Sequence, residues 1–341
     1  MRVLYGVQAT GNGHITRARV MAQALANAGV DVDYLFSGRP ANEFFDMGCF
    51  GKYKARRGLT FHMRDGAKVD LSKTLLNNSI LQLYRDIRAL DVSAYDVVIS
   101  DFEPITAWAA KLNKKQSIGI AHQYAFLHNL PDTYYSWLLR PCIRVLAPVE
   151  QAVGVHWNHF NCAIVPPLIR TARYTRGRLQ KMILVYMPYE ANETLYYWLS
   201  AFPDYDFRVY SKIEKPYVRG NVTFCPFSGE KFEKDLSLCD GVISNCGFGL
   251  ASEAMQYGKK FLSKPMKGQM EQQSNAYILK TLGLATIITE LNVETIASWL
   301  ELDNPEPKQF PDVAMMLSEW IAEGCQRPVD QLVNHIWSHA N

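Results

Sequence analysis

Short apolar runs that suit buried strands alternate with amphipathic helical stretches through the first half of the chain. The strand-like runs cover residues 2–8, 31–38, 95–101 and 116–122, and helical periodicity covers 17–29, 80–90 and 106–113. Such alternation is typical of parallel strands joined by crossover helices. The pattern therefore predicts an α/β domain with a doubly wound parallel sheet.

The same alternation restarts after a proline-rich junction. Strand-like runs cover 181–188, 206–211, 221–227 and 240–247, with helical stretches at 194–202, 232–239 and 251–258. We therefore expect two Rossmann-like domains that face each other across a central cleft. Adjacent prolines and a basic stretch mark the join. The expected boundaries are an N-terminal domain at 1–165, a linker at 166–178, a C-terminal domain at 179–312, and closing helices at 313–341 that pack back toward the N-terminal domain.

One segment fits neither period. Residues 50–73 are rich in Arg, Lys and Gly, and we expect a long loop over the first domain. The basic residues between 52 and 68 suit a solvated loop, an anionic ligand or a phospholipid surface. The aromatic and basic run at 134–146 is interpreted as a packed helix, with peripheral attachment to a membrane as the alternative.

Composition narrows the class of protein only modestly. The chain has 341 residues, of which 48% are apolar and 20% charged, as in ordinary globular proteins. A net charge of +3 is too small to predict a nucleic-acid partner. No apolar run reaches the roughly 18 residues of a membrane span, and the N-terminus lacks a signal-peptide core, so we expect a cytoplasmic protein. The seven cysteines form no CxxC pair and are predicted to be reduced.

A glycine turn follows the first predicted strand, in the run TGNGHIT, with Gly11, Gly13 and His14. Loops at the carboxyl ends of parallel strands frame the ligand crevice in open α/β sheets, and glycines let a ligand approach the backbone. The turn departs from the dinucleotide fingerprint, because Thr16 stands at the third glycine position. A neutral imidazole is suited to take a proton from a hydroxyl near neutral pH. His14 is therefore a candidate general base, with capping of the following helix as the alternative.

Asp101 ends the strand predicted at 95–101 and so belongs to the same edge of the sheet. A carboxylate that accepts from one imidazole N–H leaves the other nitrogen as the proton acceptor. We therefore predict that Asp101 orients His14. The alternative is that Asp101 caps the helix that begins near Pro104, and Glu103 is a substitute candidate for the orienting carboxylate.

A second glycine turn follows the strand predicted to end at Ser244. A helix is predicted to begin near Gly249, with Ser252 and Glu253 in its first turns. Backbone N–H groups and the dipole at a helix start favour a bound diphosphate. Glu253 can accept hydrogen bonds from ribose hydroxyls. The stretch therefore predicts a site for a nucleoside diphosphate.

These residues give the chain a resemblance to the inverting glycosyltransferases of the GT-B fold. The pattern of UDP-glycosyltransferases reads (H)CG-x5-EA-x3-G, then a proline and D/E-Q-x-x-N-A. The matching residues here are Asn245, Cys246, Gly247, Glu253, Ala254, Gly258, Pro265, Glu271, Gln272, Asn275 and Ala276. The N-terminal half is similar to the N-acetylglucosaminyltransferase of peptidoglycan precursor synthesis, through TGNGH, His122-Gln123 and PPLIR. Gln123 stands where that enzyme has a glutamate, and Asn245 where the plant pattern has a histidine.

The resemblance implies a role for each matched position. His14 would be the general base and Asp101 its partner, in an acceptor-binding N-terminal domain. The residues implied at the donor are Gly11, Gly13, Pro188, Tyr189, Phe227, Asn245, Gly247, Phe248, Gly249, Ser252, Glu253, Glu271 and Gln272. Among them, Gly247–Gly249 would hold the pyrophosphate, Glu253 the ribose, and Glu271 with Gln272 the sugar hydroxyls. Phe227 would lie near the base, and Pro188 and Tyr189 near the phosphates.

The implied activity is transfer of a sugar from a nucleotide-diphosphate donor, expected to be UDP-linked, to an acceptor hydroxyl with inversion. No cofactor and no metal are expected, because helix amides would stabilise the leaving diphosphate. The acceptor is left open among a glycan, a lipid-linked sugar and a small molecule. A lipid-linked acceptor would suit peripheral contact with the inner face of a membrane. Two other functions stay open: a nucleotide-sugar 2-epimerase of the same fold, and a nucleotide-sugar binding protein without catalysis.

Overall fold

The computed structural model describes residues 1–44, 46–59, 63–64, 68–69, 79–170, 174–175, 177 and 179–340. The chain divides into two compact units, which are described separately. Unit 1 comprises residues 1–62, 70–170 and 310–341, and unit 2 comprises 63–69 and 171–309. Unit 1 is therefore built from segments on both sides of unit 2 in the sequence.

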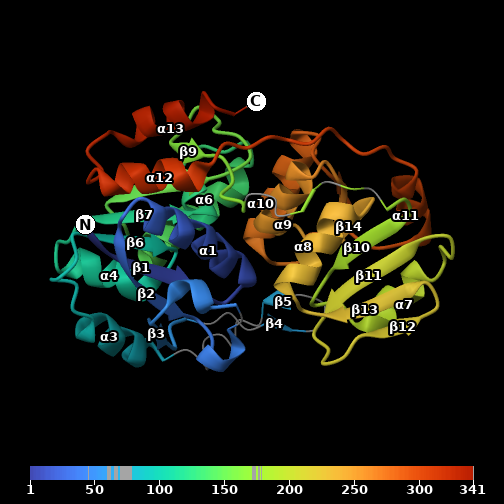
Figure 1. Ribbon diagram of the computed structural model, residues 1–341, viewed down its shortest axis with the longest axis horizontal. Coiled ribbons are helices and arrows are strands. Elements are labelled where there is room, and N and C mark those ends of the chain that lie inside the picture. Colours follow the sequence, from blue (N-terminus) through green and yellow to red (C-terminus); the bar gives the residue numbers. More distant parts are fainter. Residues whose placement is uncertain are drawn as a thin grey trace. The chain divides into compact units, whose positions relative to one another are not determined.

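Unit 1 contains a seven-stranded parallel sheet in the order β3-β2-β1-β6-β7-β8-β9 (Figure 1). Its strands are β1 (Arg2–Gln8), β2 (Asp31–Ser37), β3 (Tyr53–Arg56), β6 (Val97–Asp101), β7 (Ser117–Ala121), β8 (Gln151–Val155) and β9 (Ile164–Val165). Its helices are α1 (Asn12–Asn27), α3 (Ile80–Ala89), α4 (Pro104–Leu112), α5 (His122–Ala125), α6 (Thr133–Leu146), α12 (Val313–Ala322) and α13 (Val329–Trp337), with 3-10 turns η1 (Ala41–Glu43) and η2 (Gly48–Phe50).

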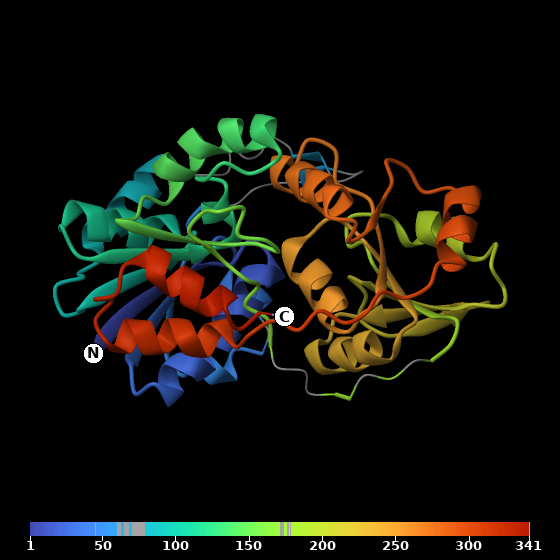
Figure 2. The ribbon, with the colours of Figure 1, turned by 90° about the horizontal axis from the view of Figure 1, so that it is seen from above.

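Helices cover the sheet of unit 1 because each carries one apolar face. In α1 the buried residues include Ile15, Ala18, Ala22 and Leu25, which repeat at helical spacing. The central strands β1 and β6 are buried almost throughout, as expected for a parallel sheet with both faces covered. The helices after residue 310, red in Figure 2, belong to this unit, and α12 packs against α1. The indole of Trp337 in α13 donates to the Ile164 carbonyl at 2.7 Å.

The loop predicted at 50–73 is wrong in its first part. Tyr53–Arg56 forms β3, which pairs in parallel with β2 at the edge of the sheet. Its residues alternate between half-buried and exposed, and the Tyr53 ring packs edge-on against Phe36 with the centroids 5.3 Å apart. Lys54 and Arg56 lie on the exposed positions, where charges protect a sheet edge. The basic side chains at the exposed positions made the two-residue period of this strand hard to recognise in the sequence. Most of the remainder of this segment lies outside the described residues.

Unit 2 contains a second seven-stranded sheet in the order β12-β13-β11-β10-β14-β15-β16, parallel except for β12. Its strands are β10 (Met182–Tyr186), β11 (Asp206–Ser211), β12 (Tyr217–Arg219), β13 (Val222–Pro226), β14 (Gly241–Ser244), β15 (Lys260–Ser263) and β16 (Thr286–Ile287). Its helices are α7 (Asn192–Leu199), α8 (Gly229–Leu238), α9 (Phe248–Gln256), α10 (Met270–Thr281) and α11 (Val293–Leu300). The short antiparallel pair β4 (Met63–Arg64) and β5 (Lys68–Val69) is grouped with this unit.

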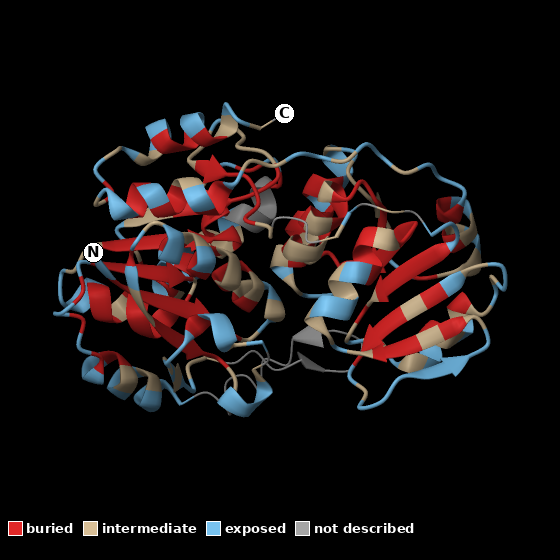
Figure 3. Ribbon diagram, viewed as in Figure 1, coloured by how far each residue is buried: buried red, intermediate tan, exposed pale blue. Residues whose placement is uncertain are grey.

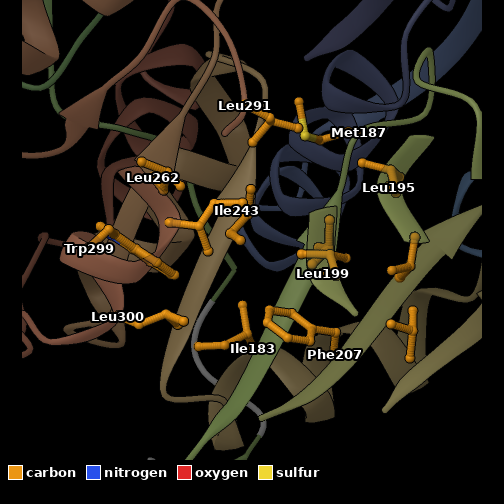
Figure 4. Packing of buried hydrophobic residues seen from close by; sticks show 14 of the residues in the cluster. Ile183, Met187, Leu195, Leu199, Phe207, Ile243, Leu262, Leu291, Trp299 and Leu300 are labelled. Atoms are coloured by element: carbon orange, nitrogen blue, oxygen red, sulfur yellow. The ribbon is translucent and has the colours of Figure 1, made fainter. Parts of the chain in front are cut away.

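The core of unit 2 forms between the sheet and the helices on one of its faces. Trp299 of α11 is almost fully buried against Ile243 and Leu262 of the central strands (Figure 4). Figure 3 shows the same division in both units: the strands are buried along most of their length, and the helices carry buried and exposed stripes. This confirms the prediction of two α/β units with parallel sheets.

The order of strands creates a switch point in each sheet. In unit 1 the chain runs outward from β1 to β2 on one side and from β6 to β7 on the other. In unit 2 the corresponding central neighbours are β10 and β14. Loops that leave such a pair diverge and open a crevice at the carboxyl ends of the strands, where open α/β sheets bind ligands. Each switch point is therefore a candidate position for chemistry.

Candidate active site

The turn from β1 into α1 lies at the switch point of unit 1. Gly11 is the N-cap residue of α1, and as a glycine it offers no capping side chain. Gly11 and Gly13 are exposed, and a Cβ atom at either position would meet no heavy atom within 4 Å. His14 is the third residue of α1, so it lies inside the helix and does not cap it.

His14 and Asp101 are brought together at this switch point. His14 Nδ1 lies 2.7 Å from Asp101 Oδ1, which joins the first turn of α1 to the end of β6. The Asp101 side chain is fully buried, and the His14 side chain keeps 14% of its surface exposed. When Nδ1–H donates to the carboxylate, Nε2 is left as the proton acceptor. The pair therefore has the geometry of a base and its orienting carboxylate.

Arg17 is a third member of this cluster, which the sequence analysis missed. Its Nε donates to Asp101 Oδ2 at 2.8 Å, and a terminal nitrogen donates to Oδ1. The same terminal nitrogen lies 3.0 Å from His14 Nδ1. Burial acts to raise the pKa of Asp101, but the charges of Arg17 and His14 and their hydrogen bonds outweigh it, so the pKa lies below 3.8. The signal in the sequence was the spacing, since residues three apart share one helix face.

Two other predicted residues lie beside this cluster. Glu103 is the N-cap of α4: its carboxylate accepts from the backbone N–H groups of Ile105 and Thr106 and from the Ser37 hydroxyl. The cap is thus Glu103 and not Asp101, and burial raises the pKa of Glu103. Gln123, in α5 after β7, places its Nε2 at 3.4 Å from His14 Nε2. An amide therefore lies beside the ring nitrogen that would take the proton.

The second glycine turn lies at the switch point of unit 2. Gly247 is the N-cap of α9, three residues after the end of β14 at Ser244, and contributes no capping side chain. Gly247 and Gly249 are partly exposed, have no left-handed φ, and would carry a Cβ atom without meeting any heavy atom within 4 Å. Neither backbone conformation nor packing within unit 2 requires glycine at these positions. Open glycines at a helix start suit the close approach of an anion to backbone N–H groups.

We expect Gly249→Ala to preserve the fold and to weaken anion binding at this helix start. Alanine stabilises a helical position by about 0.5–1 kcal/mol relative to glycine, so the melting temperature should stay level or rise. The added methyl group would stand where an anion approaches the backbone. Calorimetric titration with UDP, beside thermal unfolding, measures both effects. Gly48→Ala in η2 is the control, because its Cβ also meets open space. Unchanged UDP affinity in Gly249→Ala would contradict the assignment.

Several predicted donor residues have internal partners. Asn245 donates from Nδ2 to the Lys264 carbonyl at 3.0 Å, and the fully buried Ser252 hydroxyl donates to the Phe248 carbonyl at 2.8 Å. Gln272 accepts from the Met266 N–H through Oε1 at 3.0 Å. Asn245 and Gln272 thus hold the turn and the neighbouring loop in place, a structural role that the motif alone did not reveal, whereas the Ser252 bond lies within α9.

Asn275, matched by the motif but given no role, also supports the turn. It is buried in α10, and its Nδ2 donates to the Cys246 carbonyl at 2.9 Å. This bond ties α10 to the residue before the Gly247 cap. Glu253 in α9 and Glu271 in the first turn of α10 are partly exposed.

Aromatic residues lie at the loops on the other side of this switch point. Phe227 follows β13, is 40% exposed, and packs edge-on against Tyr186 with the ring centroids 5.9 Å apart. Pro188 is half-buried and Tyr189 is exposed in the loop after β10. An exposed ring at the carboxyl edge of a parallel sheet can stack on a nucleobase. The sequence analysis also missed an ion pair here, between Lys264 Nζ and Glu190 Oε1 at 2.5 Å.

Within the described ranges, no group of three or more His, Cys, Asp or Glu side chains is arranged to hold a metal ion. None of the helices described has the length and apolar character needed to cross a bilayer.

The chain is similar to a known protein family and to several solved structures. A family model described as glycosyl transferase family 1 matches residues 1–302. Among solved structures, the glycosyltransferase SnogD from Streptomyces nogalater has a TM-score of 0.55 at 16% identity, over 98% of this chain and 96% of that chain. The spinosyn rhamnosyltransferase SpnG has a TM-score of 0.58 at 12% identity, over 99% and 100%. SsfS6 from Streptomyces sp. SF2575, complexed with thymidine diphosphate, has a TM-score of 0.56 at 11% identity, over 99% and 95%.

These likenesses extend over nearly the whole of each chain and confirm the predicted two-domain GT-B fold. A search of curated protein sequences found no match.

Proposed function

The chain belongs to glycosyl transferase family 1 and is a glycosyltransferase, and from this premise we propose that it transfers a sugar from a nucleoside diphosphate to an acceptor hydroxyl with inversion, using His14 as general base. The observation that carries the proposal is the His14–Asp101 contact of 2.7 Å at the switch point of unit 1. In this proposal unit 1 supplies the base and unit 2 binds the donor.

The chemistry is a single displacement. His14 Nε2 takes the proton from the acceptor hydroxyl as its oxygen attacks the anomeric carbon. The bond from that carbon to the diphosphate oxygen breaks, and the nucleoside diphosphate leaves with the electron pair. One displacement inverts the anomeric centre. Asp101 holds the ring through Nδ1, and its negative charge favours the imidazolium that forms.

The donor is expected at the switch point of unit 2. The first-turn N–H groups of α9 stabilise the charge that develops on the leaving diphosphate. The partly exposed Glu253 accepts from the ribose hydroxyls, and the exposed Phe227 lies near the base. SsfS6 and SpnG have been solved with thymidine diphosphate, which supports a pyrimidine nucleotide. We propose a uridine or thymidine diphosphate sugar as donor.

A screen of nucleotides and nucleotide sugars by thermal shift tests the proposal. A ligand that binds only the native state raises the melting temperature, by an amount that grows with its concentration over Kd. We expect a nucleoside diphosphate and its sugar to give the largest shift, and the sugar to be released onto an added acceptor with opposite anomeric configuration, as read by NMR. A failure of every nucleotide sugar to bind would reject the proposal.

The same assay separates the two alternatives. A 2-epimerase would convert the nucleotide sugar into its epimer in the absence of any acceptor. A binding protein without catalysis would give a thermal shift but no turnover with any acceptor, and His14→Ala would change nothing.

A further inference from the structure

An ion pair crosses the switch point of unit 2. Lys264 follows β15 and Glu190 lies in the loop after β10, so their contact of 2.5 Å spans the end of β14, which lies between those two strands. Both side chains are mostly buried, with 20% and 14% of their surfaces exposed. The pair therefore occupies the crevice edge where the loops diverge.

The backbone of Lys264 is fixed directly beside the glycine turn. Its N–H donates to the Ser244 carbonyl at 3.0 Å, and its carbonyl accepts from Asn245 Nδ2 at 3.0 Å. Ser244 ends β14 and Asn245 is two residues before the Gly247 cap of α9. Both hydrogen bonds hold the lysine main chain, which leaves the four-carbon side chain as the part that can move.

The charges of Lys264 and Glu190 affect how an anion such as a diphosphate can bind at this position. A carboxylate at the rim of an anion site repels the ligand unless a cation neutralises it, and a partly buried position strengthens the repulsion. Lys264 neutralises the charge of Glu190 through their ion pair. An ammonium group is a compact point charge on a flexible stem, so it can exchange a carboxylate oxygen for a phosphate oxygen with little rearrangement.

We infer that Lys264 is the cation that binds the diphosphate of the donor, and that Glu190 is the partner that holds the ammonium group in position when the donor is absent. This inference rests on the proposed function. It deepens it by assigning recognition of the diphosphate charge to a side chain, in addition to the helix amides. Lys264 thereby favours a nucleoside diphosphate over the uncharged nucleoside.

Calorimetric titration of Lys264→Gln with UDP, thymidine diphosphate and the two parent nucleosides tests this assignment. A hydrogen bond to a charged group contributes about 1.5–3 kcal/mol, so the affinity for the better diphosphate should fall about ten- to hundredfold. Affinity for the nucleoside should stay within about twofold, because the base and ribose contacts are intact. Glu190→Gln should bind the diphosphate at least as tightly as the wild type.

Lys267→Gln is the matched control. Lys267 lies in the same loop and carries the same charge, but its side chain is 60% exposed and pairs with Glu290 at 3.5 Å. The control should bind UDP like the wild type. The double variant Glu190→Gln/Lys264→Gln, followed by circular dichroism, separates loss of the cation from loss of the fold, because it leaves no unpaired charge. A double variant that folds but binds the diphosphate more weakly than the wild type supports the inference.

Three results would overturn the inference. Lys264→Gln could bind the diphosphate as tightly as the wild type, Lys267→Gln could weaken it equally, or Glu190→Gln could weaken it as much as Lys264→Gln. The last result would show that the pair acts only as a structural clamp. Failure of the proposed function looks different. If unit 2 binds no donor, the wild type itself binds neither nucleoside nor diphosphate, and if the protein is not a transferase, the wild type binds the diphosphate but transfers no sugar.

Discussion

His14→Ala is expected to lower the turnover number of sugar transfer by about 10²–10⁴-fold, the usual contribution of a positioned general base. The substitution removes the nitrogen that takes the acceptor proton. The His14 side chain is partly exposed and lies on the first turn of α1, so its loss should leave the fold intact. Donor affinity should also persist, because all the proposed donor residues except Gly11 and Gly13 belong to unit 2. Steady-state kinetics with the donor found in the screen, beside donor titration by calorimetry, measure the two effects separately.

The control is His335→Ala, which removes an exposed histidine from α13. We expect this variant to keep wild-type turnover and donor affinity. Transfer at the wild-type rate in His14→Ala would remove it from the mechanism, whatever its contact with Asp101.

Asp101→Asn is expected to destabilise the protein by about 3–5 kcal/mol, the cost of leaving one charge of a buried pair without its partner. The guanidinium of Arg17 lies in the interior of unit 1 and makes two hydrogen bonds to this carboxylate. Asparagine is nearly isosteric but uncharged, so it offers Arg17 one neutral acceptor. Denaturant unfolding followed by circular dichroism measures the change in free energy of unfolding.

The double variant Arg17→Met/Asp101→Asn separates this charge effect from a loss of packing. It removes both charges, and its free energy of unfolding should recover much of the loss, as in a double-mutant cycle. Glu323→Gln is the surface control, because its pair with Arg327 is exposed and should matter by about 1 kcal/mol or less. Equal destabilisation by Asp101→Asn and Glu323→Gln would show that the buried pair contributes no more to stability than an exposed pair.

The pH dependence of stability has a definite sign at Asp101. Its pKa in the folded state lies below 3.8, its ordinary value. The unfolded chain therefore binds a proton more readily than the folded protein. The contribution of this carboxylate is present above about pH 4 and is lost as the pH falls through the lower, folded-state pKa. Asp101→Asn should abolish this part of the acid sensitivity.

The sequence predicted the fold where the local pattern was strong. Apolar runs and glycine turns located β1, β6, β10 and β14, and the carboxyl ends of these strands located the candidate site. Two-residue strands such as β9 and β16 carry too little pattern to be seen, since a period of two needs several residues. β3 was missed because its exposed positions are basic, which resembles a solvated loop.

The residues of the site also divide into those that the sequence predicted and those that it did not. His14 and Asp101 could be named because each has suitable chemistry and lies at a strand end or in the turn after one. Arg17 and Lys264 could not, because a lone basic residue becomes informative only when a partner distant in the sequence is brought beside it. The motif also located Asn245 and Gln272 without saying where their polar groups point. Hydrogen-bond direction depends on tertiary contacts that spacing does not encode.

The interleaved order of the units determines when the segments of unit 1 are translated. Residues 310–341 belong to unit 1 but are translated after all of unit 2, so α12 reaches α1 only at the end. Domains generally fold as units during translation, at roughly 5–20 residues per second. The nascent protein therefore spends several seconds with the surface of α1 that contacts α12 uncovered, and chaperone engagement is expected within that interval.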